Sequence, residues 1–152
     1  MSVVDVLYFE DLIPGRRFAS GSRALDAEAI KAFAREYDPQ PFHLDEDAAR
    51  STFFGGLAAS GWHTMATTMR LIVDSDFRPA GGVIGGGVDE FRWPKPVRPG
   101  DVLRVESEVI EARPSKSRPE IGLVRVRHTT YNQHAEIVQT FIANHVVQRR
   151  SA

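Results

Sequence analysis

Two side chains that can exchange protons stand close together in the first third of the chain. Asp38 and His43 belong to the segment Asp-Pro-Gln-Pro-Phe-His, in which two prolines restrict the backbone. A carboxylate and an imidazole held near each other can share a proton transfer, because one accepts a proton while the other donates or positions one. The same spacing also fits an aspartate that caps a turn and a histidine that packs at the start of the next helix. Both interpretations stay open on the spacing alone.

A third group with possible chemistry is the backbone amide of Gly61. It follows Ser60 at the beginning of a long apolar segment that is typical of a helix. Because glycine has no side chain, a ligand can approach the free amides of the first helical turn, where they would stabilise an oxyanion. The alternative is that Ser60 caps the helix and Gly61 is a small residue at a tight crossing.

Metal and thiol chemistry find little support in the sequence. His43, Asp45 and His63 offer nitrogen and oxygen ligands, but no HxH or HExxH pattern is present, so we expect no metal site. The chain contains no cysteine, which excludes disulfides and thiolate nucleophiles. His128 and His145 fall in predicted strands, and we expect both to be structural.

Size and composition indicate one ordinary globular domain over residues 1–152. Hydrophobic residues make up 42% of the chain and charged residues 26%, and the formal net charge is -1. This balance gives no reason to expect nucleic acid or an anionic membrane as a partner. The amino-terminal segment has no basic region followed by an apolar run, so we expect no signal peptide, no membrane span and a cytoplasmic location.

Three segments show helical periodicity. Residues 26–37 begin with Asp26 as a candidate N-cap and end where Asp38 precedes a proline; residues 46–52 favour a short helix. Residues 60–74 carry an apolar stripe that includes Trp62, Met65 and Met69, opposite a face of threonines with few charges. We therefore expect the last helix to be mostly buried.

The pattern changes to strands after a glycine-rich segment. Residues 83–93, 102–112, 121–131 and 136–148 have strand character, and residues 16–25 can be extended. Gly85, Gly86 and Gly87 precede a strand and lack a Gly-Lys-Ser/Thr ending, which argues against a phosphate loop. Early helices followed by a run of antiparallel strands predict an α+β domain in which one long helix packs on the sheet.

Taken together, these motifs resemble the MaoC-like dehydratases and the related (R)-specific enoyl-CoA hydratases. The hydratase signature places an Asp, an amide residue, a proline and a His as Asp38, Gln40, Pro41 and His43 do here. Further matches are the alanine pair at 48–49, the segment Ala-Ser-Gly-Trp-His at 59–63 and the turn Pro-Val-Arg-Pro-Gly-Asp at 96–101. The resemblance covers most of the chain.

The resemblance implies the hot-dog fold, in which a curved antiparallel sheet wraps a long central helix. It also implies catalytic roles for Asp38 and His43, with the Gly61 amide binding the thioester oxygen. Coenzyme A would be part of the substrate, and no separate cofactor is expected. Contacts to the substrate are expected from six further residues: Phe54, Ser60, Trp62, His63, Arg92 and Arg98. The two arginines are candidates for binding its phosphates, or are ordinary solvated residues at strand ends.

The activity implied is hydration of a 2-enoyl-CoA or dehydration of the corresponding 3-hydroxyacyl-CoA. Two other activities fit the same fold: a non-catalytic subunit that binds acyl thioesters, and a thioesterase. The presence of both Asp38 and His43 favours the hydratase over the non-catalytic subunit. Ser60 stands where hydratases usually carry His, and Met69 lies where some carry Ser, so the acyl group is left open. Open sheet edges and the resemblance both predict a homodimer or a multiple of it.

Overall fold

The computed structural model describes residues 5–151. Residues 1–4 lie outside that range, and with them part of the amino-terminal segment in which we expect no signal peptide. A short 3-10 turn, four helices and five strands follow one another along the chain: η1 (Phe9–Asp11), β1 (Arg17–Ala24), α1 (Ala27–Tyr37), α2 (Pro41–Leu44), α3 (Glu46–Ala49), α4 (Gly61–Val73), β2 (Ile84–Arg92), β3 (Val102–Pro114), β4 (Ile121–Tyr131) and β5 (Ile137–Gln148).

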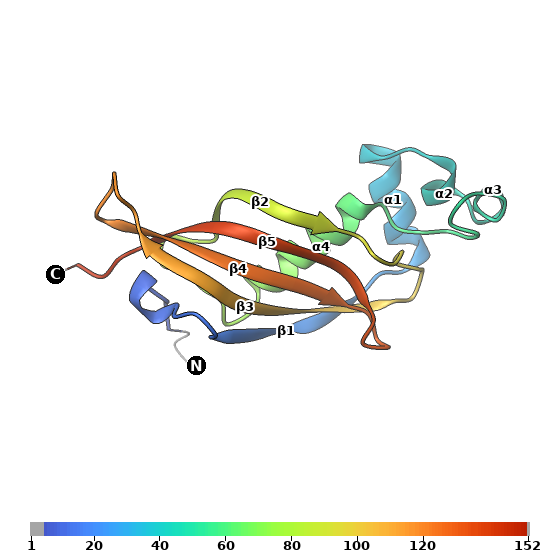
Figure 1. The fold of residues 1–152 in the computed structure, drawn as a ribbon. Helices are drawn as coiled ribbons and strands as arrows, with labels where there is room; N and C mark the ends of the chain where they lie inside the picture. The colour runs from blue at the N-terminus through green and yellow to red at the C-terminus, as the bar shows by residue number, and fades with distance from the viewer. Residues whose placement is uncertain (1–4, 152) are drawn as a thin grey trace.

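All five strands join one antiparallel sheet in the order β1-β3-β4-β5-β2. β4 lies in the centre, and β1 and β2 form the two edges (Figure 1). The alternation of buried and partly exposed side chains along β3 and β4 is the two-residue period expected of strands with one face on the core. The strands predicted from the sequence are all present, with ends that differ by at most two residues.

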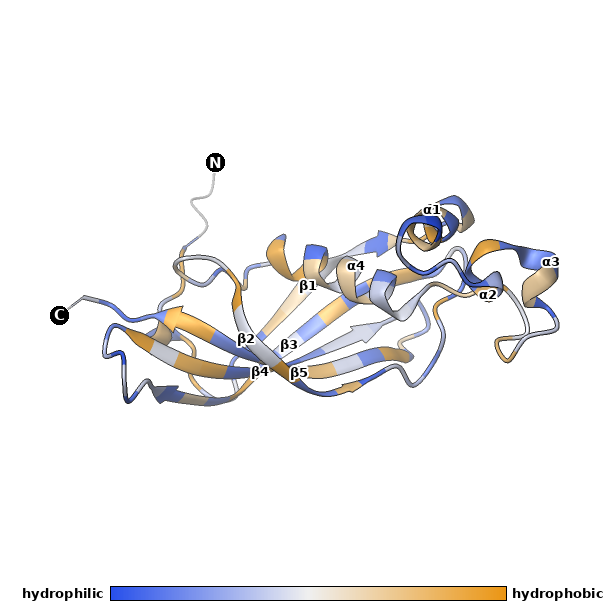
Figure 2. Ribbon diagram, turned by 90° about the horizontal axis from the view of Figure 1, so that it is seen from above, coloured by the Kyte–Doolittle hydropathy of each residue, from blue (hydrophilic) through white to orange (hydrophobic). Residues whose placement is uncertain are grey.

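The long helix α4 lies on one face of this sheet, and α1, α2 and α3 group at one end of it (Figures 1 and 2). The structure therefore confirms the predicted α+β class, with a curved sheet around one long helix. None of the helices within residues 5–151 is long and apolar enough to cross a membrane.

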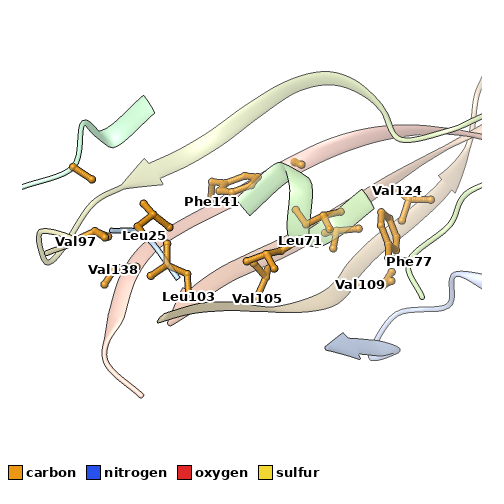
Figure 3. Packing of buried hydrophobic residues seen from close by; sticks show 14 of the residues in the cluster. Leu25, Leu71, Phe77, Val97, Leu103, Val105, Val109, Val124, Val138 and Phe141 are labelled. Carbon is orange, nitrogen blue, oxygen red and sulfur yellow. The ribbon is translucent and has the colours of Figure 1, made fainter. Parts of the chain in front are cut away.

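The core fills the space between α4 and the sheet. Leu71 of α4 packs near Val105, and Phe77 lies near Val109 and Val124, which point up from the sheet (Figure 3). The core also includes Leu12, although the amino-terminal segment shows no clear periodicity. Burial of such side chains stabilises the fold by roughly 1.5–3 kcal/mol for each one.

The buried face of α4 is only in part the one that the hydrophobic pattern favours. Leu71 and Ile72 are buried, but so are Thr64, Thr67 and Thr68, whereas Trp62 is 61% exposed and Val73 is 48% exposed. The threonines can face the sheet because their hydroxyls find partners there: Thr68 Oγ1 is 2.8 Å from Thr130 Oγ1 on β4. The apolar stripe of the helix is turned toward the sheet edge formed by β2, so the helix is buried on one side only.

Candidate active site

Asp38 is placed by the end of α1. Its own amide closes the last turn by donating to the Ala34 carbonyl at 2.9 Å, and its backbone then leaves the helix, because the following proline excludes helical geometry. Gln40, the residue before the second proline, is extended. Pro41 begins the single helical turn α2, a position that suits its fixed φ and its missing N–H. This turn brings His43 back toward Asp38.

Asp38 and His43 form a close pair. His43 Nε2 is 3.2 Å from Asp38 Oδ2, and the side chains are only 5% and 18% exposed. His43 Nδ1 lies 2.6 Å from the carbonyl oxygen of Ala58, which can only accept a hydrogen bond. Nδ1 must therefore carry a proton, and Nε2 is left free to take or give one. A direct hydrogen bond between Nε2 and the carboxylate requires one shared proton.

The Asp38 carboxyl is kept ionised by its neighbours. Burial favours its neutral form, but hydrogen bonds from Gln40 and Ser60 and the charge of His43 outweigh burial and hold the pKa of Asp38 below its usual range. Gln40 Nε2 donates to Asp38 Oδ1 at 2.5 Å. One carboxylate oxygen is thus fixed by the amide of Gln40 while the other faces His43. The carboxylate is ready to accept a proton.

Gly61 is the first residue of α4, and Ser60 is its N-cap. Ser60 Oγ accepts a hydrogen bond from the Trp62 amide at 3.3 Å, and no hydrogen bond among residues 5–151 uses the Gly61 amide. A side chain at Gly61 would collide with the indole ring of Trp93, since an added Cβ would lie 2.6 Å from its nearest carbon. The amide is free because it begins the helix, and the absence of a side chain makes room for Trp93.

These groups meet in one cavity of about 520 Å³. Asp38, His43 and Gly61 line it, so the structure brings together the three groups with candidate chemistry. Most of the remaining wall is aromatic or proline-rich: Phe42, Phe53, Phe54, Trp62, Trp93, Pro94 and Pro96. An apolar wall excludes water and strengthens the interaction of a polar group with a developing charge. The cavity suits a ligand with an apolar part and one reacting polar group.

The other predicted site residues divide into two groups. Phe54 and Trp62 line the cavity, and Ser60 does not line it but lowers the pKa of Asp38 through a hydrogen bond. His63 instead stacks on Phe33 of α1 with ring centroids 4.7 Å apart, and it does not line the cavity. Burial, with a smaller contribution from the charge of Arg23, lowers the pKa of His63. Its surroundings resemble those of a structural residue.

The two candidate arginines also lie away from the cavity wall. Arg92 is exposed at the end of β2. The Arg98 guanidinium donates to the carbonyls of Phe54, Gly56 and Leu57, the last two at 3.0 and 3.3 Å. Arg98 therefore holds the loop that carries Phe54. To bind a phosphate directly, it would have to give up hydrogen bonds to that loop.

Sequence reasoning missed Trp93 and its partner Gln139. Trp93 lines the cavity, and its Nε1 donates to Gln139 Oε1 at 2.8 Å across 46 residues of sequence. Gln139 is fully buried on β5. A glutamine at an inward position of a strand is the one signal in the sequence that could have indicated a buried polar contact, because such a group needs partners.

The chain is similar to proteins of one known family. The family model for the MaoC like domain matches residues 12–132. The crystal structure of a MaoC-like dehydratase from Rhodospirillum rubrum is similar with a TM-score of 0.92 and 55% identity, covering 96% of this chain and 99% of that one. The 3-hydroxybutyryl-CoA dehydratase of Methylorubrum extorquens is 31% identical over 77% of this chain and 73% of its own length. The (R)-hydratase PhaJ1 of Pseudomonas aeruginosa has a TM-score of 0.73 at 26% identity, covering 95% of this chain and 86% of that one. The hot-dog fold expected from the sequence is thereby confirmed.

Proposed function

We propose, since this chain belongs to the MaoC-like dehydratase family, that it reversibly adds water to the double bond of a 2-enoyl-CoA thioester. The observation that carries the proposal is the Asp38–His43 pair, with 3.2 Å between carboxylate and imidazole in an aromatic cavity that also contains Gly61. Hydration of an enoyl thioester needs one group that removes a proton from water and one that delivers a proton to the α-carbon. The pair can supply both.

In the hydration direction, a water molecule near the pair loses a proton as its oxygen bonds to the β-carbon. Asp38 is ionised and can accept that proton, and His43 Nε2 can orient the water, because Nδ1 is occupied by the Ala58 carbonyl. The electrons of the double bond move toward the thioester, whose oxygen gains negative charge. The proton that Asp38 took from water, shared with His43 Nε2 across 3.2 Å, is then delivered to the α-carbon, so that one water is added and no other atom is lost.

The Gly61 amide is the proposed partner of the thioester oxygen. It is the first amide of a thirteen-residue helix and has no hydrogen-bond partner among residues 5–151. An amide at the start of a helix, helped by the helix dipole, stabilises negative charge. Removal of one such donor from an oxyanion site commonly costs about 10²–10³ in kcat. A backbone amide cannot be removed by substitution of a side chain. A test of this role must therefore change the thioester oxygen of the substrate and not the protein.

A panel of thioesters tests the proposal. The protein is incubated with crotonyl-CoA and with 3-hydroxybutyryl-CoA, and absorbance at the enoyl band and release of free thiol are followed separately. We expect interconversion of the two thioesters without thiol release. Thiol release without hydration would instead identify a thioesterase. Binding of both thioesters without turnover would identify a non-catalytic subunit.

We also propose that the protein works in the cytoplasm as a homodimer or a multiple of one. One side of β2 is a free sheet edge, and Ile84 and Val88 on that strand are 50% and 51% exposed. The neighbouring face of α4 exposes Trp62 and Val73. Apolar side chains gathered beside an open edge favour pairing with a second copy. Analytical sedimentation that shows only monomer at micromolar concentration would contradict this proposal.

A further inference from the structure

Two cavities follow each other along one face of α4. The active-site cavity reaches Gly61, and a second cavity of about 330 Å³ begins at Met65 and includes Met69 and Ile72. These four positions are spaced by three or four residues and so share one side of the helix. Met69 lies about 12 Å beyond Gly61 at the usual helical rise. The second cavity shares no lining residue with the first.

Trp93 and Phe91 occupy the space between the two cavities. The indole of Trp93 covers Gly61, and its ring centroid lies 4.8 Å from that of Phe91. Phe91 in turn stacks on Phe141, at 5.3 Å, and Phe141 lines the second cavity beside α4 (Figure 3). A continuous row of aromatic rings therefore separates the thioester site from the apolar space farther along the helix.

Although Trp93 is 42% exposed, a chain of hydrogen bonds that leads into the core holds its indole in this position. Trp93 Nε1 donates to Gln139 Oε1 at 2.8 Å, and Gln139 Nε2 donates to Thr68 Oγ1 at 3.0 Å. Thr68 is in turn bonded to Thr130. Gln139 is fully buried. If Trp93 rotated away, the Gln139 amide oxygen would lose its hydrogen-bond donor, which is unfavourable in the protein core. The indole is thus a fixed wall and not a loose side chain.

We infer that Trp93, held by Gln139, is a specificity-determining residue that ends the acyl site and restricts the substrate to short acyl groups. The inference rests on the proposed function, since it assumes that the thioester oxygen binds at Gly61. A short acyl group fits inside the active-site cavity on the near side of the indole. A long acyl chain that continues along α4 would have to occupy the space filled by Trp93, and forcing atoms into packed space is unfavourable.

The glycine-rich segment explains why the second cavity exists. Gly85 and Gly87 on β2 line it, and a Cβ added to Gly85 would meet no atom within 4 Å. The φ of Gly85 is not in the left-handed region, so its backbone does not require glycine. A side chain at Gly85 would instead enter the cavity. Gly86 does not line it and lies near the Asn144 carbonyl, which makes it a matched control position.

Four variants test the wall through the ratio of kcat/KM for crotonyl-CoA to that for 2-dodecenoyl-CoA. We expect the wild type to favour crotonyl-CoA by at least about tenfold, and Trp93→Ala to shift the ratio toward dodecenoyl-CoA by about tenfold or more. Gln139→Met keeps the side-chain volume but removes the acceptor for Trp93, and it should shift the ratio in the same direction by a smaller factor. Gly85→Leu, combined with Trp93→Ala, should fill the second cavity and abolish the gain. Gly86→Ala in the same background should leave the gain intact.

Binding separates this inference from the proposed function. Titration calorimetry with butyryl-CoA and dodecanoyl-CoA needs no turnover, and the wild type should bind butyryl-CoA more tightly. If no enoyl thioester is hydrated while this preference is found, the hydratase proposal fails and the wall stands. The wall is overturned if the wild type binds dodecanoyl-CoA as tightly, or binds neither thioester. It is also overturned if Trp93→Ala, shown by thermal unfolding to be folded, keeps the wild-type preference.

Discussion

Histidine appears in two very different pairs in this protein. His43 faces the carboxylate of Asp38 at the wall of an open cavity. His128 faces His145 in the core, with 3.0 Å between their Nε2 atoms, and His128 Nδ1 is 2.7 Å from Ser107 Oγ. Burial lowers the pKa of His128 to about 3 and that of His145 to about 4. The core pair has no carboxylate to offset burial, and it stays neutral.

The difference shows what a proton-transfer site requires beyond histidine itself. The ring nitrogens of the core pair are hydrogen-bonded, as buried polar atoms usually are. The exception is His145 Nδ1, which has no partner among the described residues. The core pair lies beside the second cavity and not at the cavity that contains Gly61, and burial makes it resist protonation. The Asp38–His43 pair combines a carboxylate, a fixed tautomer and access to a cavity. Four tests can break or sharpen this comparison.

The largest effect is expected from Asp38→Asn. The amide keeps the shape and the turn but cannot accept a proton, so kcat/KM for crotonyl-CoA should fall by about 10²–10⁴ with little change in Tm. Asp26→Asn is the matched control, because Asp26 caps α1 through its hydrogen bond from Ala29 and Asn caps a helix about as well. A stable Asp38→Asn protein with near wild-type turnover would end the catalytic assignment.

The same comparison predicts that the pair acts as a unit. His43→Ala should cost about as much as Asp38→Asn, and the double variant should be only slightly worse than either single one. If the two losses multiply in the double variant, each residue acts independently and the proton-sharing mechanism is wrong.

A smaller, thermodynamic effect is expected from the core pair. The folded protein keeps His128 and His145 neutral, whereas in the unfolded chain a histidine gains its proton near pH 6.5. The unfolded state therefore binds more protons as the pH falls below that value, and stability falls by up to about 1.4 kcal/mol per pH unit for each ring. Urea denaturation between pH 4.5 and pH 7 should show a flatter pH dependence for His145→Leu than for the wild type.

The control for this prediction is His134→Leu, because His134 is exposed in the turn between β4 and β5. It should leave the pH dependence of stability unchanged. Equal slopes for His145→Leu and the wild type would mean that the core pair does not control acid sensitivity.

The smallest effect is expected from Gln40→Leu. Loss of its hydrogen bond to Asp38 removes one cause of the lowered pKa, so the pKa of Asp38 should rise. Since the mechanism needs ionised Asp38, the acid limb of the kcat/KM profile should move to higher pH. A net hydrogen bond contributes about 1 kcal/mol, which corresponds to a shift below about one pH unit. Gln133→Leu breaks a similar bond to Asp101 and should not move the limb. A limb that stays in place would show that Gln40 does not tune Asp38.

The sequence was sufficient to predict the helices and strands whose formation depends on residues close together along the chain. The period of three to four residues predicted α1 and α4, and alternation predicted the strands, because each pattern reflects one element facing one core. The spacing of Asp38 and His43 allowed them to meet, since only four residues, two of them prolines, lie between them, but it left a structural role for each equally open. The turn α2 between them was not predicted, although Pro41 begins it.

The remaining contacts depend on distant partners, and a local pattern carries no information about them. Arg98 contacts loop carbonyls more than forty residues earlier, and Trp93, just after β2, contacts Gln139 on β5. The second contact follows from the pairing of β2 with β5 and the first from the packing of two loops, and neither follows from spacing. His63, predicted to touch substrate, stacks instead on Phe33, which belongs to a different helix. That role for His63 stays a prediction, and its position gives it no support.

The threonine face of α4 has a consequence for conformational uniqueness. The amino-acid pattern would also allow a helix rotated about its axis, with Met65 and Met69 buried and the threonines in solvent. In that competing state Gln139 and Thr130 would lose the hydrogen bonds that Thr68 provides. Each buried group left unsatisfied would raise the free energy of that state by about 1–3 kcal/mol. Apolar packing alone discriminates poorly between such rotations, because it is non-directional. The buried hydroxyls can form their hydrogen bonds at only one rotation of α4, and this widens the energy gap between the native packing and its nearest competitor.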